Sequence, residues 1–491
     1  MTDEARNAAI ISRRHLMAGF GASAMLPTMA TLGAAASADE LHIRVAEQAR
    51  DLKNGRDVTL RLLLPNGSAA NVTPVIKAFT QMTGIQIKAI ETPVDEINTE
   101  LYLDGLSKSN QYDVALPATF GLPDLVSSKA IVPLTKFAKR YEPDGFREDI
   151  LYGIGDSFDG EIYGFQTDGD AYMTFFNKAM QQDPQNMARY SETFGYELGV
   201  PETWDELDQQ MAFFNDPENG KWGGLLFRTP SYLAWEWWVR FHAKGVWPFS
   251  PDMDPQITSP EGVEALEDMI RATDYLVPEV NKLGLFENWK RFSQGDIYCN
   301  IGWGGTQKYL TRPDSPMRGN LVYGQTPGGV FSDTLISMPY FNWGWNFVVT
   351  SNSEFPEISY LFALFASTPS MSTLAVRQPD GFFDPFRPEH YEDAQIKETY
   401  TSEFLAVHQS SMKSAIPDLY LKGQGEYFRI LADWLARALA KEIPPKQALE
   451  RVSQRWRLVT NASGLRMQQK RWQRLRWKYP AKVRAVLKDL D

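Results

Sequence analysis

The sequence predicts an α/β protein whose first sheet is parallel. Apolar segments typical of strands alternate with amphipathic segments typical of helices, in the order 57–64, 73–83, 85–90, 95–107 and 112–116. This spacing is that of βαβ units, in which parallel strands are joined by right-handed crossovers. In such sheets solutes bind beyond the carboxyl ends of the strands.

Local signals support each of these elements. Asn66-Gly67 interrupts the first strand, Pro74 suits the first turn of the helix that follows, and Gly84 ends that helix. Pro117 lies at the exit of the third strand. Later in the chain we expect a strand at 172–176, helices at 203–215, 261–275, 361–366 and 426–443, and an aromatic segment at 232–247.

Composition and charge exclude several classes of function. The 491 residues include 61 Asp and Glu against 50 Lys and Arg, a formal charge of −11 that argues against a general nucleic-acid binder. A single cysteine, Cys299, excludes an intrachain disulfide, a CxxC redox site and a cysteine-based metal cluster. With only five histidines and no cofactor motif, we expect neither a metal centre nor a cofactor.

The amino terminus has the pattern of an export signal. Arg13-Arg14 precedes a weakly hydrophobic, glycine-containing stretch that ends in Ala36-Ser37-Ala38, which predicts a twin-arginine signal peptide over residues 1–38 and an exported chain that starts near Asp39. No cysteine follows it, so a lipid anchor on a processed cysteine is excluded. The alternative is an amphipathic first helix of a cytoplasmic protein.

Five motifs in one order resemble a known family. They occupy residues 168–178, 200–207, 292–303, 323–328 with 343–351, and 444–449. Among them are Phe-Asn177-Lys178 at the end of a strand, Pro-Glu-Thr-Trp204-Asp-Glu-Leu at a helix start, and Phe-Ser-Gln-Gly295. Together they are similar to the motifs of periplasmic solute-binding proteins of ABC importers, in the group that includes maltose- and glycerol-phosphate-binding proteins. Ile297-Tyr298-Cys299 departs from the small residues and methionine usual there.

The resemblance implies a two-lobed periplasmic-binding-protein fold with hinge crossovers (type II-like). It assigns residues 55–166 and 346–395 to an N-terminal lobe, and 167–345 and 396–460 to a C-terminal lobe. It also implies a monomeric, non-catalytic periplasmic receptor that holds a carbohydrate or polyol between the lobes. The solute stabilises the closed form, which the permease subunits of an ABC importer recognise.

Candidate binding residues come from the crossovers and strand ends. Aromatic rings cover the C–H faces of sugars, while carboxylates and amides pair with hydroxyls. Following the resemblance, we expect ligand contacts from Asn66, Thr119, Asp168, Asp170, Trp235, Trp303, Trp345 and Phe382. For each of these, core packing, capping or turn chemistry is the alternative.

Two other kinds of function stay open at this stage. The same fold could bind a different small solute, such as a glycerol phosphate, which requires Arg or Lys in the cleft, or a polyamine, which requires more carboxylates. A periplasmic glycan-processing enzyme is the third alternative. Adjacent positions such as Asp168 and Asp170 fit poorly to two carboxyls that flank a glycosidic bond.

The chain ends in a basic segment that extends past the family's usual end. From Lys441 onward there are fourteen Lys and Arg against four Asp and Glu, a net charge of +10 that leaves −21 for the preceding residues. Leu465, Trp472, Leu475 and Tyr479 fall on one helical face. We expect residues 461–491 to form a helical extension that packs on the second lobe; the alternative is an interaction element for anionic lipid or the permease.

Overall fold

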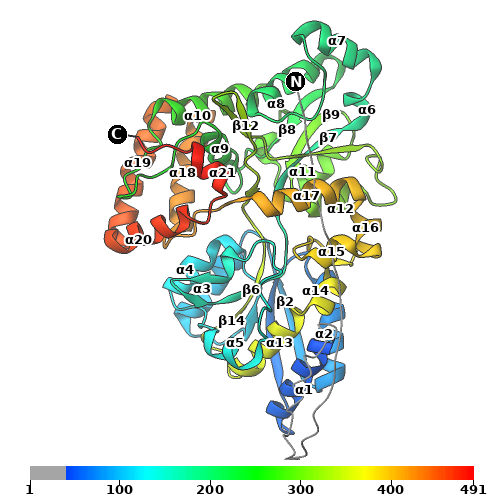
Figure 1. Ribbon diagram of the computed structural model, residues 1–491, viewed down its shortest axis with the longest axis vertical. Helices are drawn as coiled ribbons and strands as arrows, with labels where there is room; N and C mark the ends of the chain where they lie inside the picture. Colours follow the sequence, from blue (N-terminus) through cyan, green and yellow to red (C-terminus); the bar gives the residue numbers. More distant parts are fainter. Residues whose placement is uncertain (1–39, 491) are drawn as a thin grey trace, which may run out of the picture. The chain divides into compact units, whose positions relative to one another are not determined.

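The computed structural model describes residues 40–490, so the predicted signal peptide lies outside the described residues. The described chain forms two lobes, each built on its own β-sheet (Figure 1). No helix within residues 40–490 has the length and apolar character needed to cross a bilayer.

The first sheet contains the predicted parallel strands. Its order is β2-β1-β3-β14-β6, and β1 runs parallel to β2 and β3, whereas β14 is antiparallel to β3 and β6. The strands are β1 Thr59–Pro65, β2 Gln86–Thr92, β3 Val114–Ala115, β6 Gly164–Gln166 and β14 Asn346–Val349. β3 is shorter than the predicted strand because it pairs with its neighbours at two residues only.

Seven helices of the described chain cover this sheet (Figure 1). They are α1 Leu41–Lys53, α2 Ala69–Thr83, α3 Ile97–Ser107, α4 Leu122–Ser127, α5 Thr135–Tyr141, α13 Pro356–Ala366 and α14 Pro369–Val376. α2 begins four residues before the predicted start because Ala69 and Ala70 favour helix, and it contains Pro74 at the cost of a backbone hydrogen bond.

The second sheet is organised around β7. Strand β9 and strand β10 both pair antiparallel with β7, and β8 runs parallel to β9. The strands are β7 Ala171–Asn177, β8 Trp222–Leu225, β9 Ile297–Gly302, β10 Leu321–Gln325, β13 Tyr340–Phe341 and β15 Ile416–Pro417. Every residue of β7 and β9 is buried, which explains why these strands are almost wholly apolar in sequence.

Helices surround the second sheet. They are α6 Lys178–Gln181, α7 Pro184–Phe194, α8 Trp204–Phe214, α9 Leu233–Ala243, α10 Pro260–Thr273, α11 Leu285–Phe292, α12 Gly304–Leu310, α15 Pro388–Glu392, α16 Ala394–Tyr400, α17 Ser402–Ser414, α18 Gln424–Leu439 and α19 Pro445–Ala462. The predicted helix start at Thr203 is confirmed by a capping box, in which Thr203 and Glu206 bond each other's backbone N–H groups. Two small hairpins, β4 Ser157–Phe158 with β5 Glu161–Ile162 and β11 Gly329–Phe331 with β12 Thr334–Ile336, complete the described strands.

The chain passes between the two sheets three times. The crossovers are residues 167–170 between β6 and β7, residues 342–345 between β13 and β14, and residues 377–387 between α14 and α15. The first two are joined by a hydrogen bond from Thr167 N to Trp345 O (2.9 Å). The fold class predicted from the sequence, an α/β protein of two lobes joined by crossovers, is confirmed.

The C-terminal segment continues the core of the second lobe. It forms α20 Leu465–Arg476 and α21 Ala481–Val486. Trp472 is fully buried against Trp247 and Phe249, with ring centroids 5.7 and 5.8 Å apart, and its indole N–H donates to Phe249 O. Trp472, Leu475 and Tyr479 share the buried face as predicted, whereas Leu465, at the first residue of α20, is 42% exposed.

Trp472→Ala should destabilise the protein by about 3–5 kcal/mol, because it opens a cavity where two helices meet the lobe. Trp477→Ala is the matched control, since Trp477 is 75% exposed and its loss should change stability by less than about 0.5 kcal/mol. Urea unfolding of both variants tests this. Equal stabilities would show that α20 is not part of the core.

Candidate functional site

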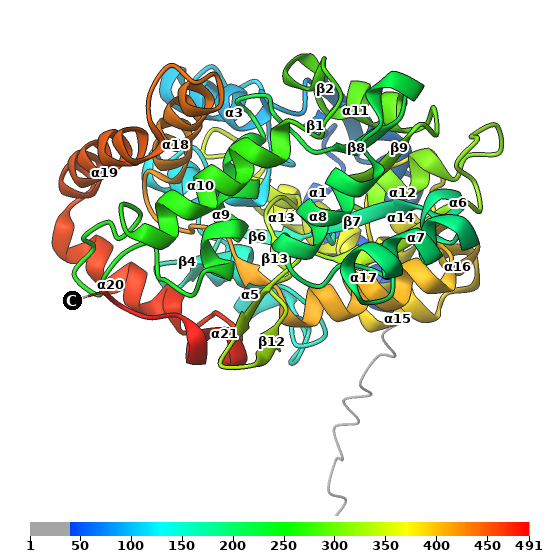
Figure 2. The ribbon, with the colours of Figure 1, turned by 90° about the horizontal axis from the view of Figure 1, so that it is seen from above.

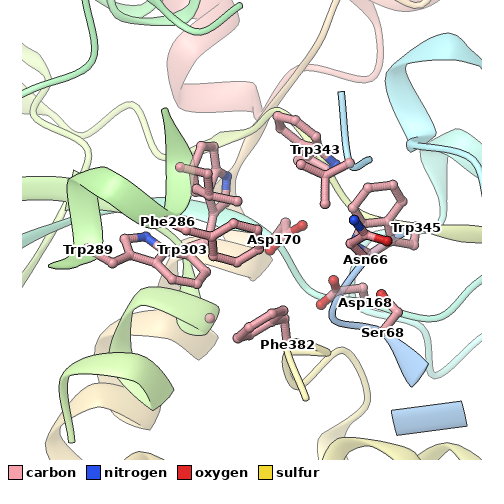
Figure 3. A pocket seen from close by; sticks show the side chains of 13 residues that line it. Asn66, Ser68, Asp168, Asp170, Phe286, Trp289, Trp303, Trp343, Trp345 and Phe382 are labelled. Carbon is pink, nitrogen blue, oxygen red and sulfur yellow. The ribbon is translucent and has the colours of Figure 1, made fainter. Parts of the chain in front are cut away.

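A pocket lies where the crossovers meet the ends of the first strands (Figure 3). Asn66 and Ser68 follow β1 and Val94 follows β2, so the carboxyl ends of two parallel strands open onto it, as the rule for such sheets predicts. The residues around it are Asn66, Ser68, Val94, Asp168, Asp170, Leu285, Phe286, Trp289, Trp303, Gly305, Trp343, Trp345 and Phe382.

The pocket is small. Its free volume is about 40 Å³, enough for about three water molecules. A ring sugar is larger than this, so it can enter only if the walls of the pocket move apart. Both lobes contribute these walls, and parting of the lobes is therefore the natural route of entry.

Aromatic rings form two opposing walls. Figure 3 shows Trp343 and Trp345 on one side of the pocket and Phe286 and Trp289 on the other, with Asp170 between them. The Trp343 and Trp345 rings are 5.7 Å apart, and Phe286 and Trp289 meet edge to face at 5.3 Å. These walls offer flat apolar surfaces to a solute placed between them.

Two indole N–H groups of these walls are buried without a hydrogen-bond partner in residues 40–490, those of Trp289 and Trp343. Trp303 differs, because its Nε1 donates to Asn342 Oδ1 (2.9 Å) and is thereby fixed in the core. A buried donor without an acceptor costs free energy. A solute that supplied oxygen atoms at these two positions would recover that cost.

Phe382 is held at the rim by Asn71. Asn71 Oδ1 accepts from the backbone N of Phe382 (2.7 Å), while Asn71 Nδ2 donates to Ala375 O (2.8 Å). At Gly381 a Cβ would lie 2.1 Å from Asn71 Oδ1, so only glycine allows this approach. The third crossover therefore presents Phe382 to the pocket through one buried amide of α2.

Three buried aspartates join the crossovers. Asp168 Oδ1 accepts from Asp384 N (2.5 Å), and Asp170 Oδ2 accepts from Gly344 N (3.0 Å). Asp384 Oδ1 accepts from Tyr400 Oη (2.7 Å). Asp168 Oδ2 and Asp384 Oδ2 have no donor among the described residues, so acceptor oxygens remain available beside the pocket.

Burial controls the protonation of these carboxyls. It raises the pKa of Asp168 and Asp170 well above the usual value, and neighbouring carboxylates raise both further. Burial also raises the pKa of Asp384 to about 6, although Lys308 opposes the shift. The same burial lowers the pKa of Lys308 to about 8, and its Nζ donates to Gln378 O (3.0 Å) and Phe383 O (3.1 Å).

The same three aspartates have the spacing of a cation site. One oxygen from each lies within 4.8 Å of the others, and oxygen ligands suit Ca²⁺ or Mg²⁺. The nearby Lys308 already supplies positive charge, and each carboxylate already accepts one hydrogen bond. The arrangement is equally suited to accept hydrogen bonds from the hydroxyls of a solute.

The structure brings six of the eight candidate residues to this pocket: Asn66, Asp168, Asp170, Trp303, Trp345 and Phe382. Thr119 and Trp235 lie outside its lining. Thr119 is buried, and its hydroxyl donates to Asn346 Oδ1. Trp235 stands behind the wall, edge to face with Trp343 at 5.2 Å. That the six contact a solute stays a prediction.

Sequence reasoning did not single out the rest of the lining. Trp343 precedes Trp345 by two residues in the crossover, and Phe286 and Trp289 share one face of α11 at a spacing of three. The motif that begins at Phe292 follows Phe286 and Trp289 directly in the sequence. This nearness to a pocket motif was the signal that could have identified them. Asp384 lies behind the lining, where it bonds Asp168. The two residues are 216 positions apart in the sequence, so no local signal could have linked them.

Two lobes joined by three crossovers, with an aromatic-walled pocket between them, are also the architecture of solute-binding proteins of known structure. A maltose-bound T. maritima protein (MalE3) has a TM-score of 0.70 at 16% identity, covering 82% of this chain and all of its own. The ribitol complex of an ABC transporter solute-binding protein from Agrobacterium radiobacter has a TM-score of 0.69 at 19% identity, covering 81% of this chain and 97% of its own. The D-mannitol complex of an ABC transporter solute-binding protein from Agrobacterium vitis has a TM-score of 0.69 at 18% identity, covering 83% of this chain and 99% of its own.

The family follows from the sequence itself. Residues 75–401 match the family described as bacterial extracellular solute-binding protein. The chain belongs to this family, whose members are exported. No curated protein matches the sequence.

Asp384→Asn should change the pH dependence of stability. Because the folded state raises the pKa of Asp384 from 3.8 to about 6, its proton stabilises the fold, and that contribution is lost as the pH rises from about 4 to about 6. The variant cannot lose it, so its thermal midpoint relative to wild type should rise across this window, by the equivalent of roughly 3 kcal/mol from this carboxyl. Lys308 stays charged throughout.

Thermal unfolding at a series of pH values measures this difference. Buried His242, His390 and His408, whose pKa values burial lowers, affect both proteins alike and cancel. Asp168 and Asp170 do not cancel: the Asp384 carboxylate raises their pKa values, so its removal lowers them and adds to the expected rise. Asp51→Asn, at an exposed position on α1 that forms no ion pair within residues 40–490, is the control and should give a flat difference. A flat or falling difference for Asp384→Asn would contradict the role given to this carboxyl.

Proposed function

We propose that this protein is a receptor that captures a carbohydrate or polyol between its lobes and delivers it to an ABC importer. The observation that carries the proposal is the pocket itself: its opposing Trp and Phe walls lie beside buried carboxylates, and two of its tryptophans have indole N–H groups without an acceptor in residues 40–490. The maltose, ribitol and D-mannitol complexes of structurally similar proteins support it.

A polyhydroxylated solute satisfies each part of this pocket. Its C–H faces would lie against Trp345 and Trp343, and its hydroxyls would donate to Asp168 Oδ2 and to Asp170. The indole N–H groups would donate to other hydroxyl oxygens. Asn66 and Ser68 would add polar contacts from the end of β1.

Contacts across the cleft stabilise the closed form. Tyr232 Oη donates to Asp95 Oδ1 (2.9 Å), and Asp124 accepts from the backbone N of Gly423 (2.5 Å) and Gly425 (3.0 Å). Asp95 follows β2 and Asp124 lies in α4, both in the first lobe, whereas Tyr232 precedes α9 and the two glycines begin α18 in the second lobe. Each contact therefore joins the two lobes. A solute that touches both lobes adds to these contacts and shifts the population toward the closed form.

The family and the leader together suggest where the receptor works. We propose that residues 1–38 direct export by the twin-arginine route and that the mature chain acts as a periplasmic monomer. The permease subunits of an ABC importer would recognise its closed form. The lobes would comprise 55–166 with 346–395 and 167–345 with 396–460, followed by the extension from 461.

Other functions fit the pocket less well. A phosphorylated solute would require a cation in the lining, but no Lys or Arg lines the pocket, and Lys308 is directed to backbone carbonyls. Glu236, a conceivable catalytic acid, is buried in ion pairs with Arg228 and Arg240. Because carboxylates lie beside the pocket, an amine is the alternative solute. Turnover assays on glycans test the alternative that the protein is an enzyme.

Trp345→Ala should weaken binding of the preferred solute about tenfold or more, since one apolar wall is lost, a change of about 1.4 kcal/mol. A thermal-shift screen of sugars, polyols, amines and sugar phosphates identifies the solute, and calorimetry measures affinity. Trp434→Ala, a partly buried tryptophan on α18 away from the pocket, should bind normally. Binding of amines alone, unchanged binding by Trp345→Ala, or sustained hydrolysis would refute the proposal.

Asp124→Ala should weaken binding of the same solute about fivefold, although Asp124 does not line the pocket. The variant leaves two backbone N–H groups of the cleft unpaired and so lowers the population of the closed form that binds tightly. Small-angle scattering with saturating solute should still show compaction. An unchanged affinity would exclude this contact from the closure equilibrium.

A further inference from the structure

The C-terminal part of the chain is one continuous basic segment. From Arg451 to Lys488 the sequence contains twelve Lys and Arg and no Asp or Glu, in a chain whose formal charge is −11. Among the described residues, three of them form ion pairs: Arg457 with Asp254, Arg471 with Asp159 and Arg476 with Asp489. The other nine have no carboxylate partner within residues 40–490: Arg451, Arg455, Arg466, Lys470, Arg474, Lys478, Lys482, Arg484 and Lys488.

Eight of these nine cations are exposed, and Arg484 is half-buried. On α20, Arg466, Lys470 and Arg474 recur every fourth residue and are exposed, whereas Trp472 and Leu475 on the other face are buried. Figure 2 shows α19, α20 and α21 along one outer margin of the described chain. The apolar face of α20 is occupied by the lobe, so its basic face is free to meet a partner.

Apolar side chains interrupt this basic face. Trp477 is 75% exposed at the end of α20, with the Arg484 guanidinium 4.6 Å from its ring centre. Leu465 and Met467 are 42% and 43% exposed at the other end of the same helix. Tryptophan, with an apolar body and a polar N–H, is enriched where membranes meet water, and basic side chains beside it favour anionic headgroups.

The distribution of charge identifies the partner. A single phosphate would need cations that converge on one point, but these are spread along three helices and match an extended negative surface. An exported protein meets such a surface at a membrane. We propose that α19–α21 dock reversibly on the surface of an anionic phospholipid bilayer, with Trp477 in the headgroup layer and the lobes held outside it.

This inference does not depend on which solute the pocket binds. Because the apolar face of α20 is buried in the lobe, docking would require no unfolding of the helix. Binding should be electrostatic in origin and therefore weaken as salt shortens the Debye length. Docking would keep the receptor near the membrane that contains its permease.

The test is co-sedimentation with lipid vesicles, using the chain from Asp39 so that the leader does not contribute. Wild type should bind vesicles of phosphatidylglycerol with phosphatidylcholine, and binding should fall steeply between about 0.05 and about 0.5 M NaCl. Replacing Lys470, Arg474, Lys478 and Lys482 together with Gln should weaken binding about tenfold or more. Trp477→Ala should weaken it by a smaller factor.

A matched control replaces four exposed lysines elsewhere, Lys77, Lys88, Lys139 and Lys413, with Gln, and should bind vesicles as wild type does. Both quadruple variants should keep the wild-type thermal midpoint and solute affinity, because none of the eight cations forms an ion pair within residues 40–490. No binding to the anionic vesicles, equal binding to pure phosphatidylcholine, or equal loss in the control would overturn the proposal. A partner protein with an acidic surface would give the first of these results.

Discussion

The hydrogen bonds that tie the three crossovers together are the constraint on which the rest of the structure depends. Asp168 binds the backbone N of Asp384, and Asp170 binds the backbone N of Gly344, so each bond joins two crossovers. Burying three carboxyls so close together is unfavourable, as their raised pKa values show. The same bonds place Trp343, Trp345 and Phe382 around one pocket.

The pocket walls are also part of the hydrophobic core. Trp303 contacts Trp343 at 5.7 Å and Trp235 at 6.2 Å, and its indole donates to Asn342 in the second crossover. A wall packed in this way loses little conformational entropy when a solute binds. Parting of the lobes would then bend the crossovers and break the contacts of Asp95 and Asp124 across the cleft.

Much of the fold could be predicted because its signals are local. The alternation of strands and helices gave the first sheet, and the end of β1 placed Asn66 at the pocket. Asp168 and Asp170 were identifiable because they lie in a motif next to a strand. Asp384 was not, since its partner is 216 residues away. Thr119 lies outside the pocket lining and bonds Asn346, 227 residues away, which its position at a strand end did not indicate. Contacts between distant segments leave no local pattern in the sequence.

Helix α20 shows how the basic C-terminal segment relates to the acidic remainder of the chain, because its two sides make different contacts. On one side Arg471 pairs with Asp159 of the β4–β5 hairpin (2.7 Å), and its guanidinium lies 5.0 Å from the Phe158 ring. This pair spans the cleft, because the hairpin packs with the first lobe whereas α20 is anchored in the second by Trp472. On the other side lie cations without partners in the described chain. If those cations rest on a membrane, parting of the lobes would break this pair, so the pair would link the orientation of the docked receptor to opening of its cleft.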